Sequence, residues 1–346
     1  MLKVITWNLE HSDRMITQNP SAAVINRRQR ILSTLRDIDP DIICLTEGPK
    51  GEKKILDFCA QVLQNEWHPV LLDPAGNPGD RDSEYGTRGA QWIWFLVKPG
   101  ILQNCSLQSP VAWKDYLGYS RWPVYYWGKT VTSQHYHYRH PQVMIYRIDN
   151  NHNMEFIGVH LKSKINMKRR TYDANGNLTG EYLDEALKAR AKLTTEARNI
   201  RRYIDVKFNQ VAAPAIVLLG DCNDGPGLDF FEERYMYFDL ITNLQGEVIV
   251  AEKYFNHSLF DYDPQLRWSA SYRVLAPDGS GTAIQPFLLD NIIFSQALVK
   301  GNFPMKVNPR AGRIEHEAYE RHNVGSNNNT KTSDHRPASC IISDNP

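Results

Sequence analysis

The segment AIVLLGDCND, residues 215–224, joins a short apolar run to polar side chains placed directly after it. Its aliphatic and β-branched residues, preceded by Pro214, are typical of a buried strand. A strand that leaves a packed sheet presents its next side chains at the rim, so we expect Asp221 and Asn223 there. Because side chains alternate along a strand, we expect Cys222 to point to the opposite face.

The same arrangement recurs along the chain. Candidate strands are expected at residues 2–7, 42–46, 91–97, 142–148, 154–161, 215–219, 287–294 and 338–342. The polar residues at or beside their ends are Asn8, Glu47, His160, Asp221, Asn223, Asp290, Asp334 and His335. A single Asn or Asp after a strand is more often a turn residue, and only the shared context favours one common pocket. Carboxylates and amides of this kind suit a hard, oxygen-liganded ion such as Mg²⁺.

Three segments between the strands have apolar residues at three- and four-residue spacing, which predicts helices at residues 22–37, 52–64 and 183–208. The chain is therefore expected to be an α+β protein with strands in the majority. The sequence has no internal repeat, no low-complexity tract and no linker of Pro, Gly and Ser. We accordingly expect a single domain over 1–346, with long loops at 73–90, 112–141 and 308–336.

Composition excludes several classes of protein. The 346 residues include 40 Lys and Arg and 39 Asp and Glu, so any polyanion must be bound by local basic clusters rather than by bulk charge. The five cysteines are scattered and form no C-x-x-C pair, which favours reduced thiols. The longest apolar run, 211–219, is far shorter than the roughly 20 residues of a membrane span. Without a recognisable secretory signal, we expect a cytoplasmic protein with no stable membrane association.

Six motifs in order resemble those of the endonuclease/exonuclease/phosphatase superfamily, the deoxyribonuclease-I-like proteins. They are Trp7-Asn8, Thr46-Glu47, VHLKS at 159–163, GDCND at 220–224, LDNIIF at 289–294 and SDHRP at 333–337. The resemblance spans nearly the whole chain. It implies a four-layer αββα sandwich of two mainly antiparallel sheets flanked by helices.

The sequence departs from the superfamily pattern at three positions. Thr46 stands where Gln is frequent, Cys222 where an aromatic residue is frequent, and Asn291 where an aromatic residue or His is frequent. None of these changes removes a reacting group. The Tyr or Arg with which many members contact the phosphate is not identified by a motif, and the candidates are Arg88, Tyr138 and Arg139.

The resemblance also implies a metal site. Glu47 is expected to be the principal Mg²⁺ ligand, with Mn²⁺ as a possible substitute. Asn8 and Asp334 are expected to complete the metal environment, directly or through water.

The remaining motif residues are expected to act on water and phosphate. Asp221 would orient or deprotonate the attacking water, and Asn223 would hold phosphate or water beside it. His335 would pair with Asp290, whose carboxylate fixes the imidazole. His160 would donate to a phosphate oxygen.

The substrate must be inferred from the loops, because the superfamily includes both nucleases and phosphoesterases of lipids and small molecules. After His160 follow Lys162, Lys164, Lys168, Arg169 and Arg170, and then an Asn175-Gly176 turn that predicts a hairpin. The 112–141 stretch is rich in Trp and Tyr and contains Arg139. A basic hairpin suits a phosphate backbone, and aromatic rings can stack on bases, although packing onto the sandwich explains most of those rings equally well.

Three functional hypotheses follow. The first is a Mg²⁺-dependent nuclease that hydrolyses DNA, or RNA, and binds it through Lys162, Lys164, Arg169, Arg170 and Arg139. The second is a phosphoesterase of a small molecule or a lipid headgroup. The third is a catalytically silent binding module, against which the full set of reacting groups argues.

Overall fold

The computed structural model describes residues 1–346 apart from 74–80, 127, 276–280, 325–330 and 346. Its centre is formed by two six-stranded sheets. In the order in which the strands pair, the first sheet consists of β17 (Met305–Ile314), β18 (Ala338–Asp344), β1 (Leu2–Asn8), β2 (Ile42–Gly48), β4 (Trp92–Val97) and β3 (His68–Pro69). The second consists of β13 (Asn256–His257), β16 (Asp290–Phe294), β12 (Ala215–Asp221), β9 (Asn153–His160), β8 (Gln142–Arg147) and β5 (Cys105–Gln108).

Each large sheet contains one parallel pair of strands. In the first sheet this pair is β1–β2, and in the second it is β9–β12, whereas every other neighbouring pair is antiparallel. The expectation of two mainly antiparallel sheets is therefore confirmed.

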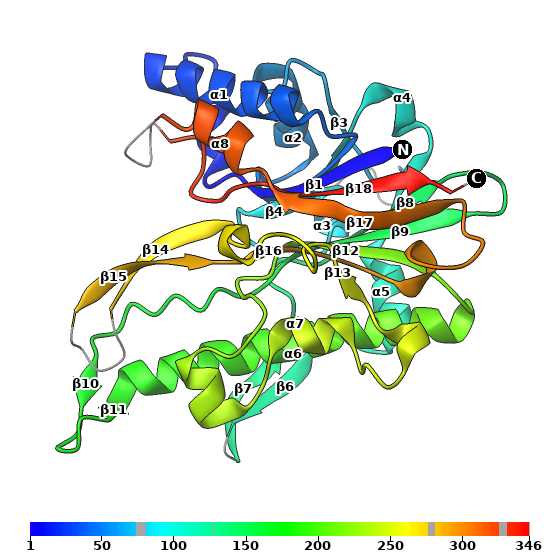
Figure 1. The fold of residues 1–346 in the computed structure, drawn as a ribbon. Helices are drawn as coiled ribbons and strands as arrows, with labels where there is room; N and C mark the ends of the chain where they lie inside the picture. Colours follow the sequence, from blue (N-terminus) through cyan, green and yellow to red (C-terminus); the bar gives the residue numbers. More distant parts are fainter. Residues whose placement is uncertain (74–80, 127, 276–280, 325–330, 346) are drawn as a thin grey trace.

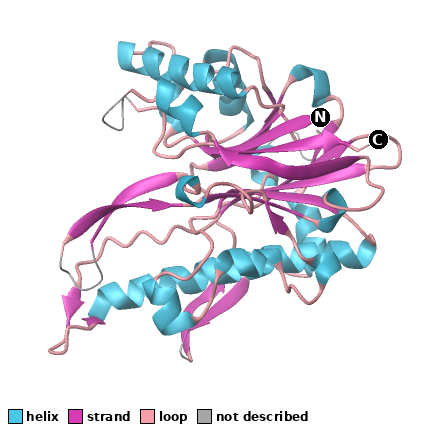
Figure 2. Cartoon of the chain, in the orientation of Figure 1, coloured by secondary structure: helices cyan, strands magenta, loops and turns pink. Residues whose placement is uncertain are grey.

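Helices cover the outer face of each sheet, so that the molecule has four layers (Figure 1, Figure 2). On the first sheet lie α1 (Ala22–Ile38), α2 (Glu52–Gln61) and α8 (His316–His322). On the second lie α5 (Pro110–Leu117), α6 (Gly180–Gln210) and α7 (Leu240–Gln245). The predicted αββα sandwich and its three long helices are confirmed.

Three layers of apolar contact hold these four layers together. The central one contains Val4 and Phe95 of the first sheet with Phe156 and Val217 of the second. The outer two join the first sheet to α1 and α2 and the second to α5, α6 and α7. Because both faces of these strands are buried, the strands read as continuous apolar runs in the sequence.

Short elements stand outside the sandwich. They include α3 (Arg81–Glu84), α4 (Pro99–Leu102) and three hairpins, namely β6 (Trp122–Tyr126) with β7 (Lys129–His135), β10 (Thr171–Tyr172) with β11 (Leu178–Thr179), and β14 (Ala270–Leu275) with β15 (Thr282–Phe287). The small β10–β11 hairpin is the one predicted from the Asn175-Gly176 turn.

The predicted loops are only partly loops. The 73–90 stretch contains α3, the 112–141 stretch contains most of α5 and the β6–β7 hairpin, and the 308–336 stretch contains the end of β17 and α8. Parts of these stretches, 74–80, 127 and 325–330, lie outside the described residues. The hairpin strands were missed because much of their surface is exposed, so that they lack the apolar runs by which buried strands are recognised.

None of the described helices is both long enough and apolar enough to cross a membrane.

Candidate active site

The two parallel strand pairs explain why residues distant in sequence meet. Parallel strands end at the same edge, and the register places Asn8 beside Thr46 in the first sheet and Asp221 beside His160 in the second. The antiparallel neighbours begin where these strands end. Asp290, the first residue of β16, lies opposite Asp221, and β18 follows directly after the 333–337 segment.

Gly220 allows β12 to approach β9 closely before Asp221. Its φ is 151°, and a Cβ atom at this position would lie 1.9 Å from the carbonyl oxygen of Val159. A side chain here would therefore force the two strands apart. The glycine thus allows Asp221 to occupy the strand end beside His160.

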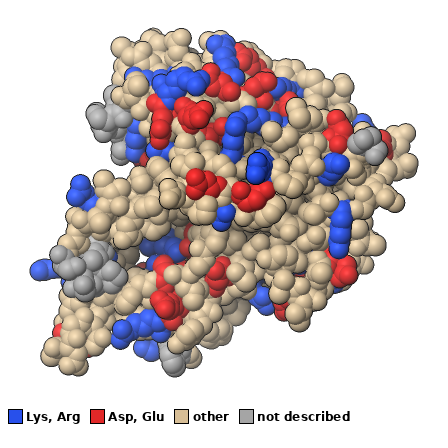
Figure 3. All heavy atoms as spheres, in the orientation of Figure 1, with Lys and Arg blue, Asp and Glu red and all other residues tan. Residues whose placement is uncertain are grey.

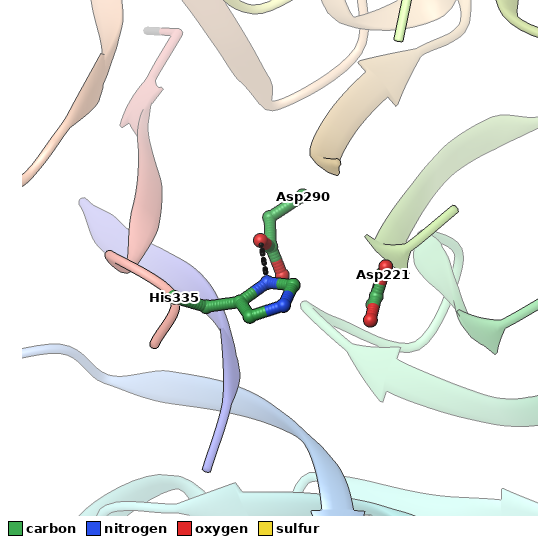
Figure 4. A group of neighbouring side chains, drawn as sticks. All are labelled: Asp221, Asp290 and His335. Carbon is green, nitrogen blue, oxygen red and sulfur yellow. Dashed lines mark hydrogen bonds and ion pairs between the residues drawn. The ribbon is translucent and has the colours of Figure 1, made fainter. Parts of the chain in front are cut away.

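Asp221, Asp290 and His335 form a buried cluster in which suitable ligand atoms lie within 4.8 Å of one another (Figure 4). His335 Nδ1 lies 2.6 Å from Asp290 Oδ2. Burial opposes a charged imidazole, but the carboxylates of Asp290 and Asp221 outweigh it and raise the pKa of His335 to about 10. The pairing of His335 with Asp290 that the motifs predicted is present, and it keeps the imidazole protonated at neutral pH.

The second ring nitrogen of His335 is engaged as well. Its Nε2 lies 2.9 Å from the hydroxyl of Tyr272, and that hydroxyl donates to Asp334 Oδ2 at 3.4 Å. Because the imidazole is protonated, both ring nitrogens carry a hydrogen and neither offers a lone pair to a metal ion. Its position in the cluster is that of a cation beside carboxylates.

Asn8 connects the two sheets. Its Nδ2 donates to Asp221 Oδ2 at 2.8 Å and to Glu47 Oε1 at 3.4 Å, and its backbone carbonyl accepts from Ser333 Oγ. Asn8 therefore fixes the strand end of β12, the Glu47 side chain and the 333–337 segment relative to one another.

Glu47 is held in an unusual backbone conformation. Its φ is 55°, in the left-handed region that non-glycine residues seldom occupy. Ser12 Oγ donates to its carbonyl oxygen, and the backbone N–H of His11 donates to Oε2 at 3.3 Å. A strained backbone of this kind is often found at a functional site, and here it turns Glu47 out of the β2 ladder beside Asn8.

His160 and Asp221 form a second buried contact, with 3.5 Å between His160 Nε2 and Asp221 Oδ2. Burial and the nearby Arg139 guanidinium lower the pKa of His160 well below its usual value, so the ring is neutral. Burial also raises the pKa of Asp221 to about 6. Asp221 can thus exchange a proton near neutral pH.

Asn223 and Arg139 lie beside this pair. Asn223, at φ 51°, donates from its backbone to Asp221 Oδ1 at 2.8 Å and from Nδ2 to the Leu161 carbonyl at 3.0 Å. Arg139 donates to the same carbonyl at 3.2 Å and to Gln91 Oε1 at 2.9 Å. Among the three phosphate-contacting candidates, Arg139 is the one whose charge acts on His160, Asp221 and Glu47.

The donor set fits a hard divalent cation. Glu47 and Asp334 are partly exposed carboxylates, and the buried Asn8 Oδ1 atom has no hydrogen-bond partner. Oxygen ligands of this kind match Mg²⁺, which keeps several waters and uses only a few protein groups. The fit supports Glu47, Asn8 and Asp334 as the residues that would hold the ion.

The basic residues after His160 differ in their surroundings. Lys164 is partly buried among three carboxylates, with its Nζ 2.5 Å from Asp224, 3.1 Å from Asp229 and 3.2 Å from Glu232. Its ammonium group is therefore part of an internal ion cluster, in contrast to the expectation that it faces a substrate. The Lys162 ammonium donates to the Ser163 carbonyl.

The later basic residues lie nearer the surface. Lys168 pairs with Glu181, Arg170 lies over the Tyr182 ring, and Arg169 is exposed. Figure 3 shows a hollow beside the β14–β15 hairpin with Lys and Arg side chains at its wall.

Several described rings of the 112–141 stretch pack against the protein. Trp113 stacks on Tyr203 of α6 at a centroid distance of 4.0 Å, and Trp122 contacts Tyr119, His135 and His137. Tyr125 and Tyr138 are half-exposed or more. Packing onto the sandwich is thus the main role of the buried rings.

Cys222 lies on the opposite face from Asp221, as predicted, and packs in the apolar layer beneath α6. Two contributors to the site were missed from the sequence. Tyr272 reaches His335 and Asp334 from β14, and Ser269 Oγ accepts from the backbone N–H of Asp290 at 3.1 Å. Neither residue follows an apolar run, so no strand-end signal marked them.

Neither a family model nor a curated protein matches the sequence. Among solved structures, the chain is similar to truncated Caenorhabditis elegans TDP2, with a TM-score of 0.50 and 11% identity over 99% of this chain and 97% of that chain. It is also similar to an endonuclease/exonuclease/phosphatase from Beutenbergia cavernae DSM 12333 (TM-score 0.43, 12% identity, 99% and 71% covered). A third similar structure is the human Nocturnin catalytic domain with bound sulfate. Its TM-score is 0.44 and its identity is 13%, over 99% of this chain and 94% of that chain.

The likeness to TDP2 identifies the architecture. The chain has the same fold as TDP2, and this fold is the four-layer sandwich that the resemblance of the six motifs implied.

Proposed function

We propose that this protein is a Mg²⁺-dependent phosphodiesterase that hydrolyses nucleic acid, with DNA preferred. One observation carries the proposal. The protonated His335, held by Asp290, lies beside the carboxylate of Asp221, which can take a proton at neutral pH, and Asn8 links Asp221 to Glu47. Phosphate ester hydrolysis needs an activated water and positive charge on the phosphate oxygens, and this cluster supplies groups for both tasks.

The metal ion, when bound through Glu47, Asn8 and Asp334, supplies positive charge to the phosphate oxygens and to the leaving oxygen. The Asp221 carboxylate orients the attacking water and accepts its proton. Its raised pKa of about 6 suits this role, because a base works best when its pKa lies near the working pH.

The other groups stabilise the charge that develops on the phosphate. His335 places a positive charge near the phosphate oxygens, and Asp290 fixes its ring through Nδ1. The neutral His160 would donate from Nε2 to a phosphate oxygen, and Asn223 would hold phosphate or water beside Asp221.

Nucleic acid is favoured as the substrate by the surface near the site. The exposed Arg169, together with Lys168 and Arg170, lies on the segment that leaves His160, where a polyanionic backbone would be neutralised. Arg139 and Lys162 lie nearer the site and would contact the scissile phosphate.

A specific observation favours a second substrate class. Ile165 and Met167, on the same segment, are 76% and 92% exposed. Exposed apolar side chains beside basic ones also suit a lipid surface. A phospholipid headgroup is therefore the alternative substrate.

A cleavage panel tests both candidates. It contains supercoiled plasmid, linear duplex, single-stranded DNA, RNA, phosphate monoesters and lipid phosphodiesters, each with Mg²⁺ or EDTA. Asp221→Ala serves as the inactive blank, and Asp184→Asn, an exposed carboxylate on α6, is the matched control. Metal-dependent cleavage of nucleic acid by the wild type and the control, but not the blank, supports the proposal. Hydrolysis of lipid alone overturns the nucleic-acid assignment, and activity in the blank overturns the mechanism.

A further inference from the structure

A cavity lies on α6, and none of the residues predicted for the active site lines it. It has a volume of about 360 Å³ and is lined by Tyr119, Trp122, Thr195, Arg198, Asn199, Arg201, Arg202 and Asp205. None of these residues belongs to the site described above. Six of them come from a single stretch of α6, so the helix forms one wall, while Tyr119 and Trp122 close the cavity from the β6 side.

The cavity carries positive charge. Arg201 is buried and fully engaged, since it pairs with Asp205 at 2.6 Å and donates to the carbonyls of Leu244, Gln245 and Lys253. The Arg201 and Asp205 charges cancel. Arg198 and Arg202 are exposed and have no carboxylate partner among the described ion pairs: Arg198 donates to Asn243 Oδ1 at 3.3 Å, and Arg202 lies over the Tyr119 ring. They are four residues apart on one helical face, a spacing at which like charges repel.

Two residues that line the cavity also carry buried hydrogen-bond donors without a partner. Asn199 is 4% exposed, and its Oδ1 accepts from Trp113 Nε1 at 3.1 Å and contacts His137 Nε2 at 2.9 Å. Because an indole nitrogen only donates, this contact fixes which end of the amide is oxygen. The buried Asn199 Nδ2 and Trp122 Nε1 atoms have no hydrogen-bond partner.

Two cations and two unpaired N–H donors around one cavity match the oxygens of an anion. Buried donors without partners are costly, and an oxyanion would satisfy both at once. The guanidinium groups of Arg198 and Arg202 suit the planar, two-point recognition that arginine gives to phosphate. The cavity volume exceeds what a carboxylate would fill.

We propose that this cavity binds a small phosphate-bearing anion. Arg198 and Arg202 neutralise its charge, and Asn199 Nδ2 and Trp122 Nε1 donate to its oxygens. Free phosphate and the phosphate of a mononucleotide share this chemistry. The site is independent of the proposed hydrolysis, because binding here requires neither the metal residues nor Asp221.

Titration calorimetry in EDTA tests the proposal with three probes: inorganic phosphate, AMP and adenosine. The full-length protein is compared with three variants. The double variant Arg198→Gln/Arg202→Gln removes both cations, and Trp122→Phe removes the indole N–H but keeps a ring. Arg147→Gln, an exposed arginine on β8, is the control. We expect the double variant to weaken phosphate and AMP binding by about tenfold or more and Trp122→Phe to weaken it by roughly threefold. Arg147→Gln should leave binding unchanged. Circular dichroism verifies that each variant is folded.

The outcomes separate the sources of the ligand chemistry. If AMP binds more tightly than phosphate, the ligand is a mononucleotide. If the two affinities are equal, the ligand is free phosphate. Both results support the site. Adenosine binding as tightly as AMP, or phosphate-probe affinities that the double variant leaves unchanged, would overturn the proposal. So would the absence of binding by phosphate and AMP up to about 10 mM.

Discussion

The first sheet brings Glu47 and Asp334 to the candidate active site partly exposed, whereas the second sheet brings His160, Asp221 and Asp290, which are only 3%, 2% and 0% exposed. The difference follows from where each chain segment goes next. Glu47 turns outward through a left-handed backbone conformation, while Asp221 and Asp290 face each other inside an antiparallel pair. Burial perturbs proton affinities, and exposure lets a hydrated cation exchange. The buried carboxylate of Asp221 therefore has a shifted proton affinity, whereas Glu47 and Asp334, the carboxylates proposed to hold the metal ion, lie on the more exposed side.

The largest effect on turnover is expected from a substitution of the buried Asp221 of the second sheet. Asp221→Asn keeps the shape but removes the proton acceptor, so turnover should fall on the order of 10²-fold or more. Initial rates on the best substrate of the cleavage panel, compared with Asp184→Asn, measure this. Near-wild-type turnover would remove Asp221 from the mechanism and contradict a catalytic role for the buried carboxylate of the second sheet.

The proposed metal ligand Glu47, at the end of β2 in the first sheet, is tested by the Mg²⁺ dependence of activity. Glu47→Gln should raise the Mg²⁺ concentration for half-maximal activity by about 10- to 100-fold, because a neutral amide replaces the charged ligand. EDTA should abolish the activity of the wild type. A Mg²⁺ titration of both proteins gives the shift, and an unchanged midpoint with a lower plateau would place Glu47 in catalysis rather than in metal binding.

Tyr272 of β14 contacts two adjacent residues of the 333–337 segment, since its hydroxyl lies against both His335 and Asp334. Tyr272→Phe should lower kcat by roughly tenfold, because the two hydroxyl contacts that position His335 and Asp334 are lost. Tyr125→Phe, on an exposed ring of β6, is the control. If Tyr272→Phe changes KM alone, the tyrosine contacts substrate rather than positioning His335.

The surface segment near the site should affect binding more than chemistry. Lys168→Gln/Arg169→Gln should raise KM for nucleic acid with little change in kcat. The slope of log affinity against log salt concentration should become shallower by about two, one for each lost phosphate contact. A slope equal to that of the wild type would show that these cations do not contact the backbone.

The smallest effect concerns stability at low pH. The Arg190 guanidinium and the Lys164 ammonium hold the pKa of Asp229 at about 2, against burial. A carboxylate with a depressed pKa contributes stability above its unfolded pKa near 4, and that contribution is lost as the pH falls towards 2. Asp229→Asn should lower the free energy of unfolding by about 1–2 kcal/mol at pH 6 and by much less at pH 2. Urea unfolding at both pH values measures this, and a difference that is independent of pH would contradict it.

The sequence predicted the central strands well because they are buried on both faces, whereas the αββα arrangement was implied by the resemblance of the six motifs. The runs at 2–7, 42–46 and 215–219 correspond to β1, β2 and β12, with changes of one or two residues at the ends. The exposed hairpins β6–β7 and β14–β15 were not predicted, because alternation and burial are weak there. Buried apolar runs are the signal that a single sequence carries most clearly.

The sequence also predicted some parts of the candidate site better than others. Strand ends pointed to Asp221, Asp290 and Asn8. Asp221 ends β12 opposite Asp290, which begins the antiparallel β16, and Asn8 at the end of β1 donates to Asp221 from the other sheet. The basic segment was predicted by composition alone, so Lys164 was expected to face a substrate although three acidic side chains surround it. Which cations are free depends on the segments that fold against them.

The sequence by itself determined the alternation of apolar runs and polar ends, and with it the fold and the inventory of reacting groups. Only the tertiary structure decided which of these groups are neutral, charged or paired. Proton affinity depends on burial and on charges from other strands, and those neighbours are distant in sequence. The same holds for the cavity on α6, where Asn199 and Trp122 are ordinary residues until folding leaves their N–H groups buried and without a partner.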